Sequence, residues 1–126
     1  MTPGIVNGRP LTWLRAEALA TAVAALVVFG ATGRPWWLVP ALFLVPDLSC
    51  LGYLAGPKAG AWIYNLVHSA PLSLALLAAG AGWHLTALTV AGAVGLFHIG
   101  LDRVLKFGLK YDHSFGVTHL GDNGKQ

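Results

Sequence analysis

The stretch LFLVPDLSCLGYLAG, residues 42–56, is apolar except for a single carboxylate, Asp47, which directly follows Pro46. It belongs to a longer apolar segment, residues 36–55, which has the roughly 20 residues that a helix needs to cross a bilayer. Pro46 has no backbone N–H to donate, so we expect a kink that frees a carbonyl near Leu42. Such a kink opens space around the carboxylate and supplies it with polar neighbours.

The composition is that of a membrane protein of one domain. Apolar residues make up 56% of the 126 residues and charged residues 10%, against about 25% charged residues in soluble domains. The mean hydropathy is +0.64. A net charge of +3 without any long basic run predicts no nucleic-acid partner. The only cysteine, Cys50, excludes an intrachain disulfide.

Four segments are apolar and long enough to cross the bilayer, which is therefore the first partner that we expect. They are residues 11–30, 36–55, 61–80 and 85–105. The links between them are short, which favours antiparallel neighbours. We therefore predict an all-α integral membrane protein, an up-down bundle of four transmembrane helices within residues 1–110. Residues 111–126 are expected to form a cytoplasmic tail that partly packs on the bundle.

Positive charge predicts the orientation of the spans. Seven of the eight lysines and arginines fall on one side of the four-span arrangement, and only Arg34 falls on the other. Cytoplasmic loops carry such an excess, so both termini are expected in the cytoplasm. An alternative for the first segment is a signal peptide, because Arg9 and Arg15 precede its apolar core.

Each predicted span carries polar residues at a similar depth. A rise of about 1.5 Å per residue places them roughly 9–12 Å from the cytoplasmic ends of the spans. An aspartate at the middle of a membrane costs about 2.5–3.5 kcal/mol, so such residues usually face the protein interior and mark function. The members of this polar layer are Glu17, Asp47, Asn65, His68, His98 and Asp102.

The spacing of these residues suggests a metal site. His98 and Asp102 are four residues apart and project from one helix face, as do Tyr64 and His68. Carboxylates with neutral imidazoles form a ligand set for zinc, iron or manganese. The Glu-x-x-His motif of di-metal bundles is absent. The predicted metal ligands are Glu17, Asp47, His68, His98, Asp102 and, capping the layer from the tail, His119, with His113 as a further candidate.

Simpler interpretations stay open for several of these residues. Glu17 can interact with the helix dipole or pair with Arg15. Asp102 can form an interfacial ion pair with the adjacent Arg103. The histidines can be neutral and hydrogen-bonded between helices, and the tail can be loose.

Two strings carry a family resemblance. PDLSCLGYLAGPKAGAWIYNLVH, residues 46–68, and HIGLDRVLKFGLKYDHSFGVTHLG, residues 98–121, resemble the signatures of a family of small bacterial membrane proteins described only as a domain of unknown function. The resemblance covers nearly the whole chain and implies a location in the bacterial inner membrane. Its signatures coincide with the polar layer. They add weight to His119, and they add Lys110 to Tyr64 and Asn65 as supporting residues.

Four functions are compatible with this layer. The first is a metal-dependent membrane enzyme that acts on an apolar or lipid-like small molecule. The second is binding of protons, ions or a small ligand without catalysis, for which we expect a homodimer. The third is haem binding through His68 and His98. The fourth is a structural or regulatory membrane partner. The sequence contains no nucleotide-binding loop, nucleophile elbow or haem-attachment motif.

Overall fold

The computed structural model describes residues 4–112 and 115–122, and most of these are helical. The all-α class is therefore as predicted. The helices are α1 (Gly8–Ala31), α2 (Leu38–Leu42), the 3-10 helix η1 (Val45–Ala55), α3 (Pro57–His68), α4 (Ala70–Gly82) and α5 (Thr86–Val104). The short strands β1 (Val117–Thr118) and β2 (Gly121–Asp122) form an antiparallel hairpin in the tail.

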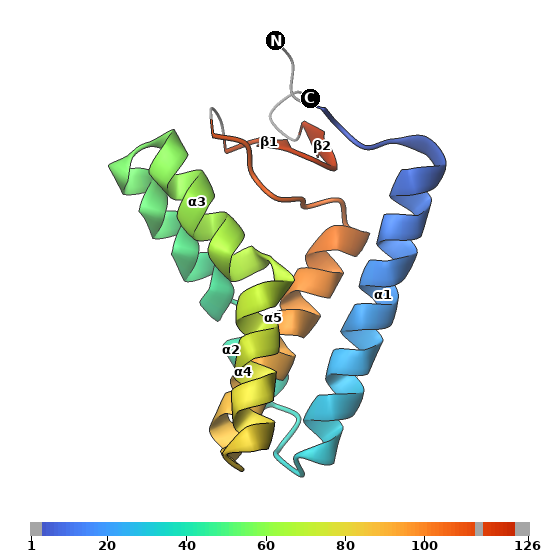
Figure 1. Cartoon of the computed structure of the whole chain (residues 1–126), viewed down its shortest axis with the longest axis vertical. Helices are drawn as coiled ribbons and strands as arrows, with labels where there is room; N and C mark the ends of the chain where they lie inside the picture. Colours follow the sequence, from blue (N-terminus) through green and yellow to red (C-terminus); the bar gives the residue numbers. More distant parts are fainter. Residues whose placement is uncertain (1–3, 113–114, 123–126) are drawn as a thin grey trace.

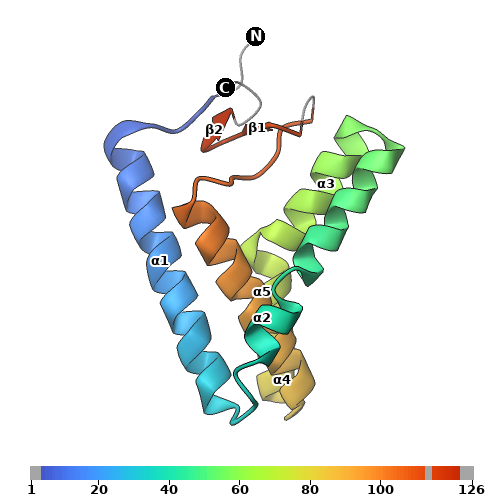
Figure 2. The ribbon, with the colours of Figure 1, turned by 180° about the vertical axis from the view of Figure 1, so that it is seen from behind.

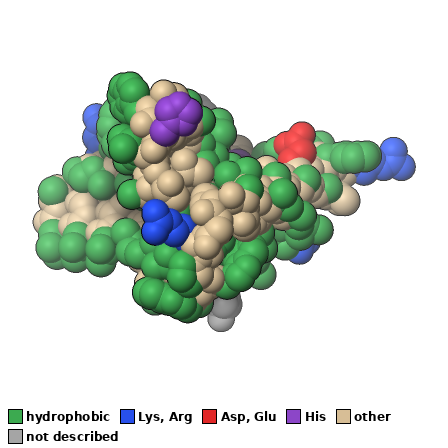
Figure 3. Space-filling model, turned by 90° about the horizontal axis from the view of Figure 1, so that it is seen from below, with side chains coloured by type: hydrophobic (Ala, Val, Ile, Leu, Met, Phe, Trp, Pro, Cys, Tyr) green, Lys and Arg blue, Asp and Glu red, His purple; other side chains and the backbone are tan. Residues whose placement is uncertain are grey.

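Three helical segments are long and apolar enough to cross a membrane: α1, residues 38–55, and α5. A fourth crossing is present if α3 and α4 count as one bent span. Almost no residue of the segment 38–55 is fully buried, and large apolar side chains such as Leu44, Leu51 and Leu54 are exposed. Seen from the end opposite the termini, the surface is largely hydrophobic side chains and backbone, with isolated charges (Figure 3). Apolar surface of this extent marks contact with a membrane or a partner.

The second predicted span is not one continuous α-helix. The α-helix α2 ends at Leu42, and the chain continues as η1. The N–H of Asp47 donates to the carbonyl of Leu44, three residues back, at 3.0 Å. Pro46 explains the change, because its ring nitrogen has no hydrogen for an α-helical bond. An 11-residue 3-10 helix is unusual, since such runs rarely exceed three or four residues.

The third predicted span, residues 61–80, is also broken. The helix α3 ends at His68, Ser69 is extended, and α4 leaves at a bend of about 40°. Pro71 lies in the first turn of α4, where its missing N–H costs nothing. Both breaks place residues of the predicted polar layer at or beside a helix end.

The helices form an open V rather than a compact bundle. Helix α5 packs against α1 and α4, whereas η1 packs mainly against α3. Figures 1 and 2 show α1 and the η1–α3 pair diverging towards the end that carries both termini. Chain direction does alternate from segment to segment. The up-down four-helix bundle predicted from the sequence is nevertheless not confirmed.

The C-terminal tail crosses the wide end of the V (Figure 1). Lys110 pairs with Thr118, which joins the segment after α5 to the hairpin. The N–H of Val6 donates to the carbonyl of His119 at 2.8 Å, and the Tyr111 hydroxyl donates to the Gly4 carbonyl. These bonds tie the two ends of the chain together over the same face.

Small residues allow α1 and α5 to approach closely. Ala18 and Ala22 of α1 are buried beside Gly100 of α5. A Cβ atom on Gly100 would lie 2.7 Å from the Ala18 carbonyl oxygen and 2.9 Å from the Ala22 nitrogen. These are backbone atoms, so no side chain can rotate away to make room. Helix pairs in membranes commonly rely on such small residues.

Replacing Gly100 by alanine is expected to force α1 and α5 apart. The matched control is Gly82→Ala at the end of α4, where an added Cβ meets nothing within 4 Å. We expect Gly100→Ala to be less stable than Gly82→Ala by about 1–3 kcal/mol, the usual cost of overpacking. Unfolding followed by circular dichroism in one detergent measures the difference. Equal stabilities would contradict the close approach.

Candidate metal centre

Four side chains from three helices meet at one point. Asp47 comes from η1, His68 is the last residue of α3, and His98 and Asp102 lie one turn apart on α5. The Asp47 Oδ1 atom lies 3.2 Å from the Nε2 atom of His68 and 3.3 Å from that of His98. Asp102 Oδ2 lies 3.2 Å from His98 Nε2 and 3.9 Å from His68 Nε2. We call these four residues the Asp–His cluster.

Backbone carbonyls fix the orientation of both imidazole rings. The His68 Nδ1 atom lies 3.1 Å from the carbonyl oxygen of Tyr64, and His98 Nδ1 contacts that of Phe43. A carbonyl only accepts hydrogen bonds, so each Nδ1 carries the hydrogen. In a neutral ring the lone pair then resides on Nε2, which is the atom facing the carboxylates. Metal-binding histidines are typically held in this way.

The break before η1 supplies one of these carbonyls. In a continuous α-helix the Phe43 carbonyl would accept from the N–H of Asp47, but that N–H donates to Leu44 instead. The Phe43 carbonyl is therefore available to His98. The sequence predicted a carbonyl freed near Leu42, one residue away.

The cluster has the spacing and charge of a cation site. Ligand atoms about 2.1 Å from a tetrahedral zinc ion lie about 3.4 Å apart, and the four separations above run from 3.2 to 3.9 Å. Two carboxylates and two neutral rings carry two negative charges, which a buried site must offset. His98 Nε2 is buried and has no hydrogen-bond partner among the described residues.

The cluster is closed on one side and open on the other. The side chains of His68 and His98 are fully buried, and that of Asp102 is 14% exposed. The Asp47 side chain is 45% exposed. A ligand or water molecule can therefore reach the cluster past Asp47. Asp47, His68 and His98 alone could hold a metal ion, because their ligand atoms lie within 4.8 Å of one another.

Comparison with known proteins places the chain in one family. Residues 11–122 match the model described as "Domain of unknown function (DUF4260)". The chain belongs to the DUF4260 family. The resemblance found in the sequence, to a family of unknown function, is thus confirmed. No curated protein and no solved structure matches the chain.

A stack of rings extends from the cluster of this DUF4260 chain towards the tail. The Tyr64 ring lies parallel to His68, with centroids 3.8 Å apart. The Lys110 Nζ atom lies 4.7 Å from the Tyr64 ring centroid and 4.0 Å from that of Phe115. The Lys110 side chain is buried, and this burial lowers the pKa of its ammonium group. Cation–π contacts are strongest when desolvated in this manner.

Asn65 fastens the tail to α3. Its side-chain amide donates to the Lys110 carbonyl at 2.8 Å and accepts from the Lys110 N–H at 2.6 Å. Asn65 and Lys110 were predicted from the sequence as supporting residues. Asn65 bonds Lys110, Lys110 lies over the Tyr64 ring, and it is Tyr64 that contacts His68 of the cluster. Together with Tyr64 they position the tail over His68.

Two predicted ligands are not brought into the cluster. Glu17 is exposed on α1. His119 Nδ1 accepts a hydrogen bond of 2.9 Å from the N–H of Leu109, so it organises the tail. Burial lowers the pKa of the His119 imidazole, and the positive charge of Arg103 lowers it further. His113, the further candidate, lies outside the described residues.

Sequence analysis missed the role of Arg103. Its guanidinium donates to the carbonyl of His68 at 2.5 Å and to that of Phe107 at 2.6 Å. It thereby satisfies the end of α3 and holds His68 in place from α5. Its position next to Asp102 suggested an ion pair. The signal that could have revealed its role is the break before Pro71, which leaves carbonyls without helical partners.

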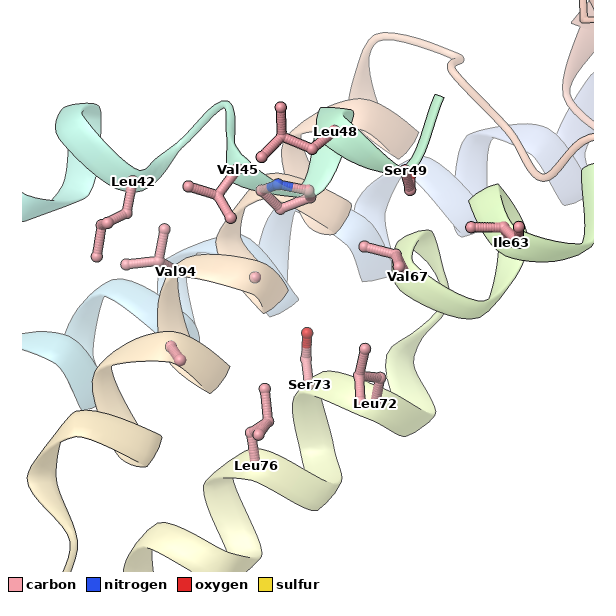
Figure 4. A pocket seen from close by; sticks show the side chains of 13 residues that line it. Leu42, Val45, Leu48, Ser49, Ile63, Val67, Leu72, Ser73, Leu76 and Val94 are labelled. Atoms are coloured by element: carbon pink, nitrogen blue, oxygen red, sulfur yellow. The ribbon is translucent and has the colours of Figure 1, made fainter. Parts of the chain in front are cut away.

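An apolar cavity of about 520 Å³ lies beside the cluster (Figure 4). Its walls come from the end of α2 and from η1, α3, α4 and α5. Ser49 belongs to its lining and also contacts His68 Nδ1 at 3.4 Å. Apart from Ser49 and Ser73, the lining consists of aliphatic residues, proline and glycine. A cavity of this size falls within the range of roughly 300–1,000 Å³ seen for small-molecule sites.

The two hydrogen bonds between Asn65 and the Lys110 backbone, called here the Asn65 clasp, are expected to control release of the tail. In Asn65→Asp a carboxylate replaces the amide donor and faces the Lys110 carbonyl, at a cost of about 1–3 kcal/mol. We therefore expect trypsin to cut after Lys106 about tenfold faster or more, because cleavage follows local opening. Asn7→Asp is the control, since Asn7 is exposed and makes no capping bond. Equal cleavage of both variants would contradict the clasp.

Docking of the tail is expected to weaken in mild acid. The fold lowers the pKa of His119, so the neutral ring is the docked form, and the unfolded tail binds the proton more readily. The stabilisation is complete above the ordinary histidine pKa of about 6.5 and is lost as the pH falls below it. Amide exchange of residues 107–112, corrected for intrinsic rates, measures this loss. His119→Asn keeps an acceptor without a titrating ring and should remove its share of the pH dependence.

Proposed function

We propose that this DUF4260 protein is a metal-dependent membrane enzyme that acts on an apolar, lipid-like substrate. The observation that carries the proposal is the orientation of His68 and His98. The Nδ1–H of each ring donates to a backbone carbonyl, and both Nε2 atoms face the same oxygen of Asp47. Lone pairs that face one another at 3.2–3.3 Å repel unless a metal ion lies among them or one of the groups is protonated.

The ligands suit zinc, iron or manganese. Two imidazoles with one or two carboxylates match zinc sites and the two-histidine, one-carboxylate iron sites, whereas magnesium and calcium prefer oxygen alone. When bound, such an ion polarises an oxygen of the substrate or lowers the pKa of a bound water. His68, His98 and Asp102 are the buried anchors. Asp47 is the ligand on the open side, where it can also accept a proton.

The site is proposed to lie inside the bilayer. We count four crossings, with α3 and α4 together as one bent span, arranged up and down. Seven of the eight lysines and arginines then fall on the side of the termini, which makes that side cytoplasmic in a bacterial inner membrane. The tail with Lys110 and Arg103 would cover the site from the cytoplasm. A substrate that partitions into lipid reaches it sideways.

A second candidate function is proton or ion binding without catalysis. The separations of 3.2–3.3 Å are also within reach of hydrogen bonds from doubly protonated histidines. In that case each imidazolium pairs with a carboxylate and no metal is needed. Haem binding is not favoured, because the His68 and His98 rings touch edge to face with centroids 5.2 Å apart. A macrocycle has no room between them.

Metal analysis decides between the two candidates. We expect about one zinc, iron or manganese ion per chain in protein purified without a metal-affinity tag. Asp47→Asn removes a charged ligand at constant shape, and His98→Ala removes a buried anchor. Each should lower metal affinity at least about tenfold, as even outer-shell changes do.

The controls repeat these changes away from the cluster. Asp112→Asn and His84→Ala alter exposed residues and should leave the metal content unchanged. If the native protein binds none of the three metals while all four variants keep their helical circular dichroism, the metalloenzyme proposal fails. The proton-binding alternative then remains.

A further inference from the structure

We infer that the cavity beside the Asp–His cluster binds the hydrocarbon chain of a single-chain amphiphile, whose oxygen-bearing head lies at the cluster. This inference rests on the proposed function and names its substrate class. It excludes two-chain phospholipids as the bound molecule. The ligand would enter from the bilayer with its chain between η1 and α4.

The chemistry of the walls selects a hydrocarbon. Val45, Leu48, Val67, Leu72 and Val94 face the space from four helices, and no lining residue is charged (Figure 4). A water-filled cavity would need polar partners that these walls do not offer. A volume of about 520 Å³ suits one small ligand or chain rather than a pair of acyl chains.

Of the two serines in the apolar wall, Ser73 points to a ligand. The Ser73 side chain is 4% exposed, and its hydroxyl points into the cavity (Figure 4). It makes no hydrogen bond to any described residue. Because its oxygen opens onto the cavity, this hydroxyl is free to bond a ligand there. An oxygen of the ligand close to its head group would provide the missing partner.

The cavity adjoins the cluster through residues that are neighbours of the cluster's members. Ser49 lines the cavity and contacts His68. Pro46 lines it next to Asp47, and Val67 lines it next to His68. Gly95 lines it one turn from His98 and leaves room for the Ser73 hydroxyl, which would lie 2.6 Å from an added Cβ. A chain seated in the cavity therefore brings its head to the exposed side of the metal ligands.

The test is photo-crosslinking of the purified full chain in nanodiscs. The probe is a 16-carbon fatty acid with a diazirine in mid-chain, and mass spectrometry locates the labelled peptides. We expect labels on residues 42–49, 63–76 and 91–95. Ala91→Phe fills the cavity from an exposed position on α5 and should reduce labelling at least about fivefold. Ala20→Phe makes the same change on an exposed position of α1, away from the cavity, and should not.

Ser73→Ala isolates the hydroxyl. Loss of one hydrogen bond should weaken binding of the fatty acid by about two- to tenfold. It should not affect a diazirine alkane of the same length, which has no oxygen to bond. Equal labelling in Ala91→Phe and Ala20→Phe would overturn the inference. Labelling of the cavity by a diacyl phospholipid probe as strong as that by the fatty acid would also overturn it, because the space would then hold ordinary bilayer lipid.

The same experiment on the native protein, with and without metal removal by a chelator, separates this inference from the proposed function. The cavity walls include no member of the Asp–His cluster, so labelling of the walls should persist without metal. Persistent labelling in a protein that binds no metal would leave the chain site standing and the enzyme proposal refuted. Metal binding without selective labelling of the cavity would refute the chain site and leave the enzyme proposal standing.

Discussion

Backbone N–H and C=O groups need hydrogen-bond partners inside a membrane. This constraint connects the breaks in the helices to the Asp–His cluster. Each unsatisfied group costs several kcal/mol in hydrocarbon, so irregular backbone persists only where the protein itself pairs it. The chain breaks two of its apolar segments, after Leu42 and after His68. In each case a side chain of α5 pairs a carbonyl at the break. His98 donates to the Phe43 carbonyl, and Arg103 donates to that of His68.

This arrangement gives α5 a central position. It packs on α1 through small residues, contributes two members of the cluster, and anchors both broken segments. The hydrogen bond from His98 to the Phe43 carbonyl has two effects. It pairs a carbonyl that the broken helix leaves free, and it fixes the tautomer and orientation of the His98 ring. Removing the imidazole would expose a carbonyl and remove a ligand together. Stability and site geometry are therefore coupled at this residue, which is a usual property of buried polar networks.

The sequence predicted the helical class, the apolar segments and all four residues of the Asp–His cluster, because hydropathy and helical spacing carry that information directly. Asp47, His68, His98 and Asp102 stood out as ionisable residues at a common depth. Depth alone could not separate them from Glu17, since rotation about α1 decides whether a side chain faces inward. His119 looked like a ligand, but its partner is a backbone N–H in the tail, which no side-chain pattern reveals. The V-shaped arrangement depends on which faces pack, and apolar faces that meet lipid and faces that meet helices have similar compositions.

The hydrogen bond between Val6 and His119 has a consequence for the biogenesis of the protein. Val6 is made more than a hundred residues before its partner His119. His98 and Asp102 also belong to α5, the last of the described helices along the chain. A nascent chain that has made only α1 to α4 thus exposes Asp47 and His68 without the side chains and the cover that complete the cluster. Assembly of the cluster must therefore follow synthesis of α5, and closure of the tail over it comes later still.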